Sequence, residues 1–175
     1  MGINNIGAGK NIFLIGFMGC GKSTMARLLA EELQMQLVEM DETIEVEEKR
    51  SITEIFASDG EAYFRDLETQ LITKIADRGN MVVSCGGGAV LREENVVQMK
   101  RNGYVVYLCA TPETIYERVH TSTNRPLLNG NMNVPYIREL MEKRISKYEA
   151  AADEIVLVDG KTKLDILKEI KDLFA

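Results

Sequence analysis

Residues 16–23 read Gly-Phe-Met-Gly-Cys-Gly-Lys-Ser. This is a glycine, four residues and then Gly-Lys-Ser, the spacing of a P-loop that cradles nucleotide phosphates. The context agrees with the motif, because an apolar run at 11–15 predicts a buried strand before it and apolar residues at helical spacing predict a helix over 22–33. We therefore expect the backbone N–H groups of the loop and the positive end of the helix dipole to face a phosphate chain.

The P-loop assigns the nucleotide site. Its nucleotide-binding residues are predicted to be Gly19, Cys20, Gly21, Lys22, Ser23 and Thr24. Lys22 should reach the β- and γ-phosphates as a catalytic cation, and the Ser23 hydroxyl should be a ligand of Mg²⁺. ATP and Mg²⁺ are the expected cofactors. A plain glycine-rich turn is the alternative, and the agreement of motif and context disfavours it.

Strand-like and helix-like segments alternate along the rest of the chain. Further strands are predicted over 37–40, 81–84, 104–108 and 155–158. Helices are predicted over 52–56, 61–76, 111–119 and 164–174, the first with a Ser-x-x-Glu capping box and the third with Thr-Pro at its start. This order indicates an α/β fold, a mostly parallel sheet with helices on both faces in one domain, 1–175.

Composition restricts the possible partners and the location of the protein. The 175 residues include 45% apolar and 27% charged residues, with a net charge of −6. An acidic balance argues against a nucleic-acid partner, and no apolar stretch reaches the length of a membrane span. The sequence has three cysteines, an odd number, which predicts reduced thiols. Residues 1–10 lack the apolar core of a signal peptide and are predicted to form a flexible tail. Together these features predict a cytoplasmic location. We expect a monomer.

One long segment, about 120–133, lacks clear periodicity and is rich in Asn, Thr, Ser and Gly. A loop of this length in a compact domain is usually functional, so we predict a lid. It contains Arg125.

The P-loop and five later motifs together resemble the shikimate kinases. The motifs are Gly16–Thr24, Asp41 after the second strand, ITEIFASDGEAYFR at 52–65, SCGGGAV at 84–90, RPLL at 125–128, and Lys143-Arg144 with Tyr148 and Ala152. The resemblance extends over about 11–158. It implies a nucleoside-monophosphate-kinase-like fold with a five-stranded parallel sheet of order 2-3-1-4-5. It also implies transfer of phosphate from ATP to the 3-hydroxyl of shikimate, on the route to the aromatic amino acids.

The resemblance also implies a clamp for the shikimate carboxylate. Arg65 and Arg144 match the family's carboxylate-binding arginines, and a guanidinium can bind a carboxylate through two parallel hydrogen bonds. The triple glycine, Gly86, Gly87 and Gly88, follows a predicted strand, where ligands bind in such sheets. Without side chains, these residues would let the substrate approach the backbone.

Two acidic residues follow the second strand. Asp41 is predicted to orient the attacking hydroxyl and to accept its proton; a helix N-cap is its alternative role. Glu39 stands where the family often has Asp. A longer carboxylate could still reach the water shell of Mg²⁺, but we leave Glu39 out of the metal ligands.

Two further arginines are assigned to the nucleotide. Arg125 matches the family's lid arginine, which stabilises charge on the transferring phosphoryl group. Arg118 is expected either to stack on adenine, as in the family, or to be an exposed charge on the helix 111–119.

Two other functions fit parts of the sequence. Another small-molecule P-loop kinase, of the gluconate type or acting on a nucleotide, would share the phosphate cradle and the lid but not the full clamp. A non-catalytic nucleotide-binding module would be expected to have lost Lys22 or Asp41, and both are present.

Overall fold

The computed structural model describes residues 9–121, 128 and 130–174. The predicted tail, 1–10, and the predicted lid, about 120–133, lie partly outside these residues. Arg125 lies entirely outside them, so its assignment stays a prediction.

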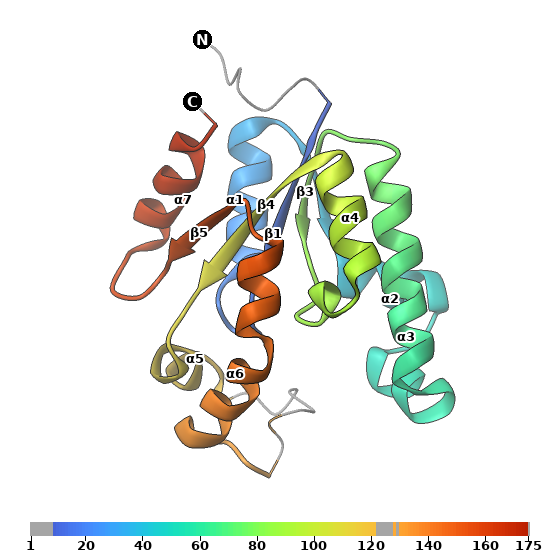
Figure 1. Ribbon diagram of the computed structural model, residues 1–175, viewed down its shortest axis with the longest axis vertical. Helices are drawn as coiled ribbons and strands as arrows, with labels where there is room; N and C mark the ends of the chain where they lie inside the picture. The colour runs from blue at the N-terminus through green and yellow to red at the C-terminus, as the bar shows by residue number, and fades with distance from the viewer. Residues whose placement is uncertain (1–8, 122–127, 129, 175) are drawn as a thin grey trace.

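The described residues form a five-stranded parallel sheet of order β2-β3-β1-β4-β5, which confirms the predicted topology (Figure 1). The strands are β1 (Asn11–Ile15), β2 (Gln36–Glu39), β3 (Met81–Ser84), β4 (Gly103–Cys109) and β5 (Glu154–Leu157). In the register of the sheet, Ile12 of β1 lies opposite Val82 of β3 and Tyr104 of β4. All residues of β1 are buried because this central strand has neighbours on both edges and helices over both faces.

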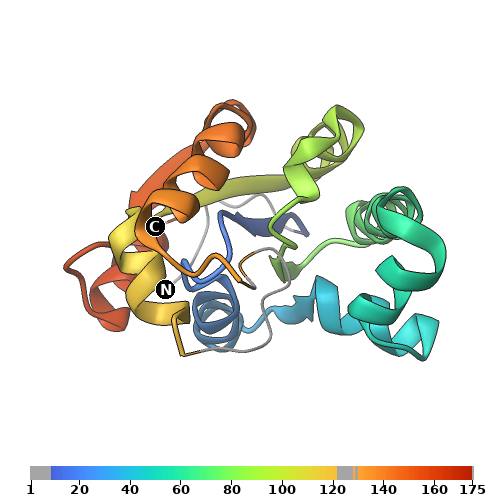
Figure 2. The same cartoon turned by 90° about the horizontal axis from the view of Figure 1, so that it is seen from below.

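Helices cover both faces of the sheet (Figure 2). One face carries α1 (Lys22–Leu33) and α7 (Lys163–Asp172), and the other carries α4 (Glu93–Arg101) and α6 (Val134–Ala151), with α3 (Ile52–Ala76) packed beside α4. The short helices α2 (Met40–Glu48) and α5 (Pro112–Val119) and the 3-10 turn η1 (Ala89–Leu91) follow β2, β4 and β3. Among the described helices, none is both long and apolar enough to cross a bilayer.

Several predicted boundaries differ from the structure. Met40 begins α2 instead of ending β2. The pairing of β2 with β3 ends at Glu39, and Met40 is fully buried as the first residue of the helix. The two helices predicted over 52–56 and 61–76 are consecutive parts of α3, and the predicted break between them is confirmed at Gly60, whose φ of 83° and ψ of 173° are not helical. The predicted capping box at its start, Ser51 with Glu54, is confirmed. The helix α4 was not predicted, since its charged sequence buries only Asn95 and Met99.

This topology places the functional loops together. In a parallel sheet all strands end on the same edge, so the loops after β1, β2, β3 and β4 meet there. These loops contain the P-loop, Asp41 and the triple glycine.

Candidate active site

The P-loop connects β1 to α1, and its conformation depends on glycine. Gly16, Gly19 and Gly21 have φ angles of 147°, 78° and 102°, values that other residues rarely adopt. The side chain of Lys22 folds back over the loop, where its Nζ donates hydrogen bonds to the carbonyl oxygens of Gly16 (2.8 Å) and Phe17 (3.1 Å). Lys22 is 9% exposed, so a buried cation lies at the position predicted to contact the nucleotide phosphates.

The predicted metal ligand, Ser23, has an acidic neighbour. Its hydroxyl donates to Glu39 Oε2 at 3.0 Å and lies 3.3 Å from the hydroxyl of Ser84, at the end of β3. The other carboxylate oxygen of Glu39, Oε1, is buried without a hydrogen-bond partner among the described residues. An orphaned carboxylate oxygen beside a serine hydroxyl fits a hydrated Mg²⁺, which prefers oxygen ligands and retains several waters.

Asp41 lies in the first turn of α2, whose N-cap is Glu39. The alternative role of Asp41 as an N-cap is therefore wrong. Burial raises the pKa of Asp41, the positive charge of Lys22 opposes this, and the negative charges of Glu45 and Glu39 add to it. The result is a pKa above the ordinary 3.8 for a carboxyl group that faces the P-loop lysine.

Arg65 lies in α3 and is held by two carboxylates. Its Nη1 is 2.6 Å from Glu68 Oε2, and its Nη2 is 3.0 Å from Glu61 Oε1. Glu68 is fully buried, and burial raises its pKa although the charge of Arg65 opposes the shift. One oxygen of Glu68, Oε2, holds the Arg65 guanidinium. The other, Oε1, has no hydrogen-bond partner among the residues described.

The triple glycine passes between these charged groups. A Cβ added to Gly86 would lie 2.6 Å from Glu68 Oε1 and 3.0 Å from Asp41 Oδ1. A Cβ added to Gly88 would lie 2.4 Å from Arg65 Nη1. Side chains at these positions would therefore displace Asp41, Glu68 or Arg65.

Helix α6 supplies the second predicted clamp arginine. The Nη1 of Arg144 lies 3.5 Å from the carbonyl oxygen of Gly87, to which the Tyr148 hydroxyl also donates at 2.5 Å. Burial raises the pKa of Tyr148 to about 12, so the hydroxyl remains a donor at neutral pH. Two side chains of α6 thus point at the central glycine of the loop.

Arg118 extends from α5 over the P-loop. Its Nη1 donates to the carbonyl oxygen of Gly19 at 3.3 Å. The exposed side chain is therefore in contact with the phosphate cradle, where a nucleotide base could reach it.

The geometry agrees with comparisons to known proteins. The family model described as "Shikimate kinase" matches residues 18–174. The chain belongs to the shikimate kinase family.

Relatives in this family cover nearly the whole chain. A shikimate kinase of Persephonella marina is 45% identical over 161 residues, which is 92% of this chain and 96% of the relative. A shikimate kinase of Dehalococcoides mccartyi is 41% identical over 93% of this chain and 92% of its own length.

Solved structures agree in fold. A shikimate kinase from Acinetobacter baumannii in complex with shikimate superposes with a TM-score of 0.90 at 31% identity, covering 98% of this chain and 96% of that one. The Aquifex aeolicus enzyme gives a TM-score of 0.79 at 38% identity, with coverages of 91% and 93%. These findings confirm the predicted P-loop kinase fold and the predicted ATP-dependent shikimate kinase activity, and they do not favour the gluconate-type, nucleotide-kinase or non-catalytic alternatives.

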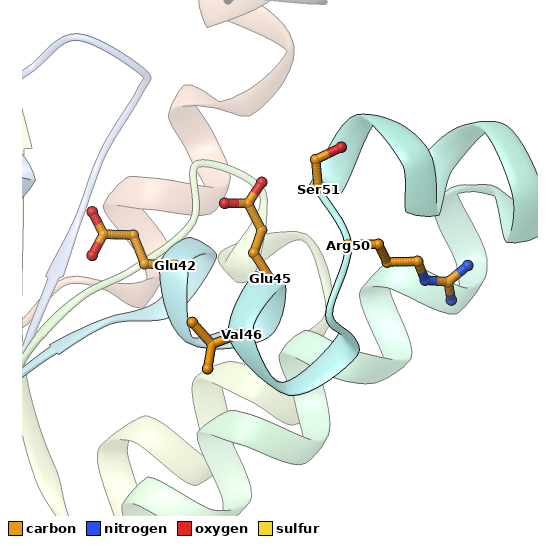
Figure 3. Close-up of a pocket in the computed structure, with 5 residues that line it drawn as sticks. All are labelled: Glu42, Glu45, Val46, Arg50 and Ser51. Atoms are coloured by element: carbon orange, nitrogen blue, oxygen red, sulfur yellow. The ribbon is translucent and has the colours of Figure 1, made fainter.

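One shallow pocket of about 450 Å³ lies apart from these shikimate kinase residues (Figure 3). It is lined by Glu42, Glu45, Val46, Arg50 and Ser51, on α2 and the turn before α3. None of the predicted site residues lines it, and in Figure 3 Arg50 points away from the two carboxylates. Arg50 instead contacts Glu48, Ser58 and Asp59, so we assign this pocket no part in the reaction.

Two site residues escaped the sequence analysis. Glu68 could have been predicted from the sequence, because it follows Arg65 by three positions on a helix, the spacing of an ion pair. The contact of Ser84 with Ser23 could not have been predicted from the sequence, because it comes from the pairing of β3 with β1.

Proposed function

We propose that this chain transfers the γ-phosphoryl group of ATP to the 3-hydroxyl of shikimate in the site formed by these loops. One observation carries the proposal: Gly87 lies between the phosphate cradle and the carboxylate clamp. A Cβ on Gly87 would be 3.8 Å from Gly16 O and Met18 N, and 3.9 Å from Arg144 Nη1. A donor on the P-loop and an acceptor held by Arg144 would therefore meet beside this glycine.

The nucleotide half consists of the P-loop, from Gly19 to Thr24. Its backbone N–H groups would bind the phosphates, and Lys22 would exchange its carbonyl partners for phosphate oxygens as charge develops there. Ser23 and, through water, Glu39 would hold Mg²⁺, which supplies charge neutralisation on the phosphates when bound.

The acceptor half consists of Asp41, the two clamp arginines and the triple glycine. Arg65 and Arg144 would bind the carboxylate of shikimate, with Glu68 fixing the first guanidinium. Asp41 would orient the 3-hydroxyl toward the phosphoryl group and accept its proton. Phosphoryl transfer depends mainly on positioning and charge stabilisation, so orientation is the larger part of this role.

Two arginines complete the proposal. Arg118 would stack on the adenine, since it already lies against the P-loop at Gly19. Arg125 lies outside the described residues, and the resemblance of 125–128 to the family's lid motif supports its role over the transferring phosphate.

A coupled assay of ADP release tests this function. The purified protein is incubated with ATP and Mg²⁺ and with shikimate, gluconate or a nucleoside monophosphate as acceptor. We expect release that depends on shikimate. Release with another acceptor and none with shikimate would retain the P-loop kinase and reject the proposed clamp.

We also propose that the protein acts as a monomer in the cytoplasm, without nucleic-acid or membrane partners. Three cysteines, all free in the structure, fit a reducing compartment, and the net charge of −6 disfavours anionic polymers. Sedimentation velocity at several protein concentrations tests the monomer; a mass that doubles as the concentration rises would reject it.

A further inference from the structure

The carboxylate of Asp159 connects two elements that are distant in sequence. Asp159 lies in the loop after β5, and its Oδ1 accepts three hydrogen bonds from the start of α5. The donors are the Thr111 backbone N–H (3.0 Å), the Thr111 hydroxyl (2.9 Å) and the Thr114 hydroxyl (2.5 Å). Partial burial raises the pKa of Asp159, but the hydrogen bonds from Thr114 and Thr111 outweigh it, so the pKa lies below its ordinary value.

These bonds are more than a helix cap. Thr111 already caps α5, because its hydroxyl accepts from the Thr114 backbone N–H at 3.3 Å. The loop that carries Asp159 is itself fixed to the sheet, since the Val158 N–H donates to the Cys109 carbonyl oxygen at 2.9 Å. Asp159 therefore joins α5 to the carboxyl end of the sheet.

The other end of α5 packs directly on the P-loop. A Cβ on Gly19 would lie 2.6 Å from Val119 Cγ1 and 3.8 Å from Ile115 Cδ1, and both residues are buried. Arg118, between them, donates to the Gly19 carbonyl oxygen. This short helix is therefore held at its first turn by Asp159, at its last turn by the P-loop and along its side by α6.

We infer that Asp159 is a positioning residue for the nucleotide: it holds α5 in the place where Val119 and Arg118 shape the P-loop at Gly19. This inference rests on the proposed function only in placing the nucleotide on the P-loop. Loss of the Asp159 carboxylate leaves the first turn of α5 joined to the rest of the chain by fewer bonds. The nucleotide site then loses its preformed wall. The clamp for shikimate is affected less: α5 packs on α6, where Arg138 pairs with Glu113, but Arg65 and the triple glycine lie on other elements.

The test compares the binding of two ligands by calorimetry, with ADP and shikimate titrated separately into each variant. Hydrogen bonds to a charged group are stronger than those between neutral groups, and part of the stabilisation that they give α5 should be lost in ADP binding. We expect Asp159→Ala to raise the Kd for ADP about tenfold and to change the Kd for shikimate less than about twofold. Asp159→Asn keeps the shape and the acceptor oxygen, so its effect should be smaller.

A matched control comes from the neighbouring helix. Asp165 accepts from the Thr162 backbone N–H (3.0 Å) and from the Thr162 hydroxyl (2.6 Å), and these bonds lie at the start of α7 and not of α5. Asp165→Ala should lower the unfolding temperature as much as Asp159→Ala does, and it should leave the Kd for ADP unchanged. Unchanged ADP binding in Asp159→Ala, or equal weakening of ADP and shikimate, would overturn the inference. Wild-type protein that binds shikimate but no ADP would instead refute the proposed nucleotide site.

Discussion

Replacing Gly88 with alanine should disable the carboxylate clamp without removing any charged group. Gly88 has φ of −102° and ψ of 5°, so the backbone itself accepts an alanine. The new Cβ would lie 2.4 Å from Arg65 Nη1 and 2.6 Å from Cζ and Nη2. Ordinary contact begins at 3.4 Å, so the guanidinium must move by about 1.0 Å, the difference between 3.4 and 2.4.

The displaced group is the end of a side chain, which the fold can tolerate. The function cannot, because misplacement of a positioning group by about 1 Å can lower the rate about 100-fold. We therefore expect kcat/KM for shikimate to fall about 100-fold, equivalent to about 2.7 kcal/mol of transition-state stabilisation. ADP binding and the unfolding temperature should stay close to those of the wild type.

The assay is coupled ADP release at varied shikimate and saturating ATP. Val97→Ala is the control, because Val97 lies on α4, outside the site, with its side chain 58% exposed. Its kcat/KM should equal that of the wild type. A folded Gly88→Ala protein with wild-type kcat/KM would refute the reasoning that Arg65 must keep its observed position.

Three other substitutions test single groups. Lys22→Ala should lower turnover about 100-fold or more with every acceptor, since it removes the cation of the cradle; wild-type turnover in the coupled assay would contradict this. Glu39→Gln should raise the Mg²⁺ concentration needed for half-maximal binding of a fluorescent ADP analogue about 10- to 100-fold, and an unchanged Mg²⁺ titration would exclude a role near the metal. Burial raises the pKa of Asp41, so the folded state binds this proton more tightly than the unfolded state, and ionisation costs stability as the pH rises from about 3.8 through the folded pKa. Asp41→Asn should therefore abolish turnover but unfold at a higher urea concentration than the wild type at pH 7; equal or lower stability would contradict the shifted pKa.

The sequence predicted the parts of the fold whose signals are local. The bounds of β1, α1 and β3 agree with the structure residue for residue, because each is a mostly apolar run or a periodic segment between turn-forming residues. The helix α4 was missed because only two of its nine residues are buried. The turn from β2 to α2 was placed one residue late, since Met40 is apolar in either element.

Most residues of the site could be predicted from the sequence, but most contacts between them could not. The P-loop, Asp41 and the triple glycine are motifs that a single sequence can show. The contacts between them depend on the packing of elements that are far apart in the chain. Glu68 reaches Gly86, and Asp159 reaches Thr111 across 48 residues, and the sequence carries no sign of either contact. The same packing places Arg118 against the P-loop, and its stacking on adenine stays a prediction.

The central claim is that Asp41 and the clamp present one particular hydroxyl of shikimate to the nucleotide on the P-loop. The most direct test is phosphorus NMR of the product formed from ATP and shikimate, with the phosphorus–proton coupling used to locate the new ester. The account predicts a single product phosphorylated at the 3-hydroxyl. Phosphate on another hydroxyl, or only free phosphate from hydrolysis of ATP, would contradict it.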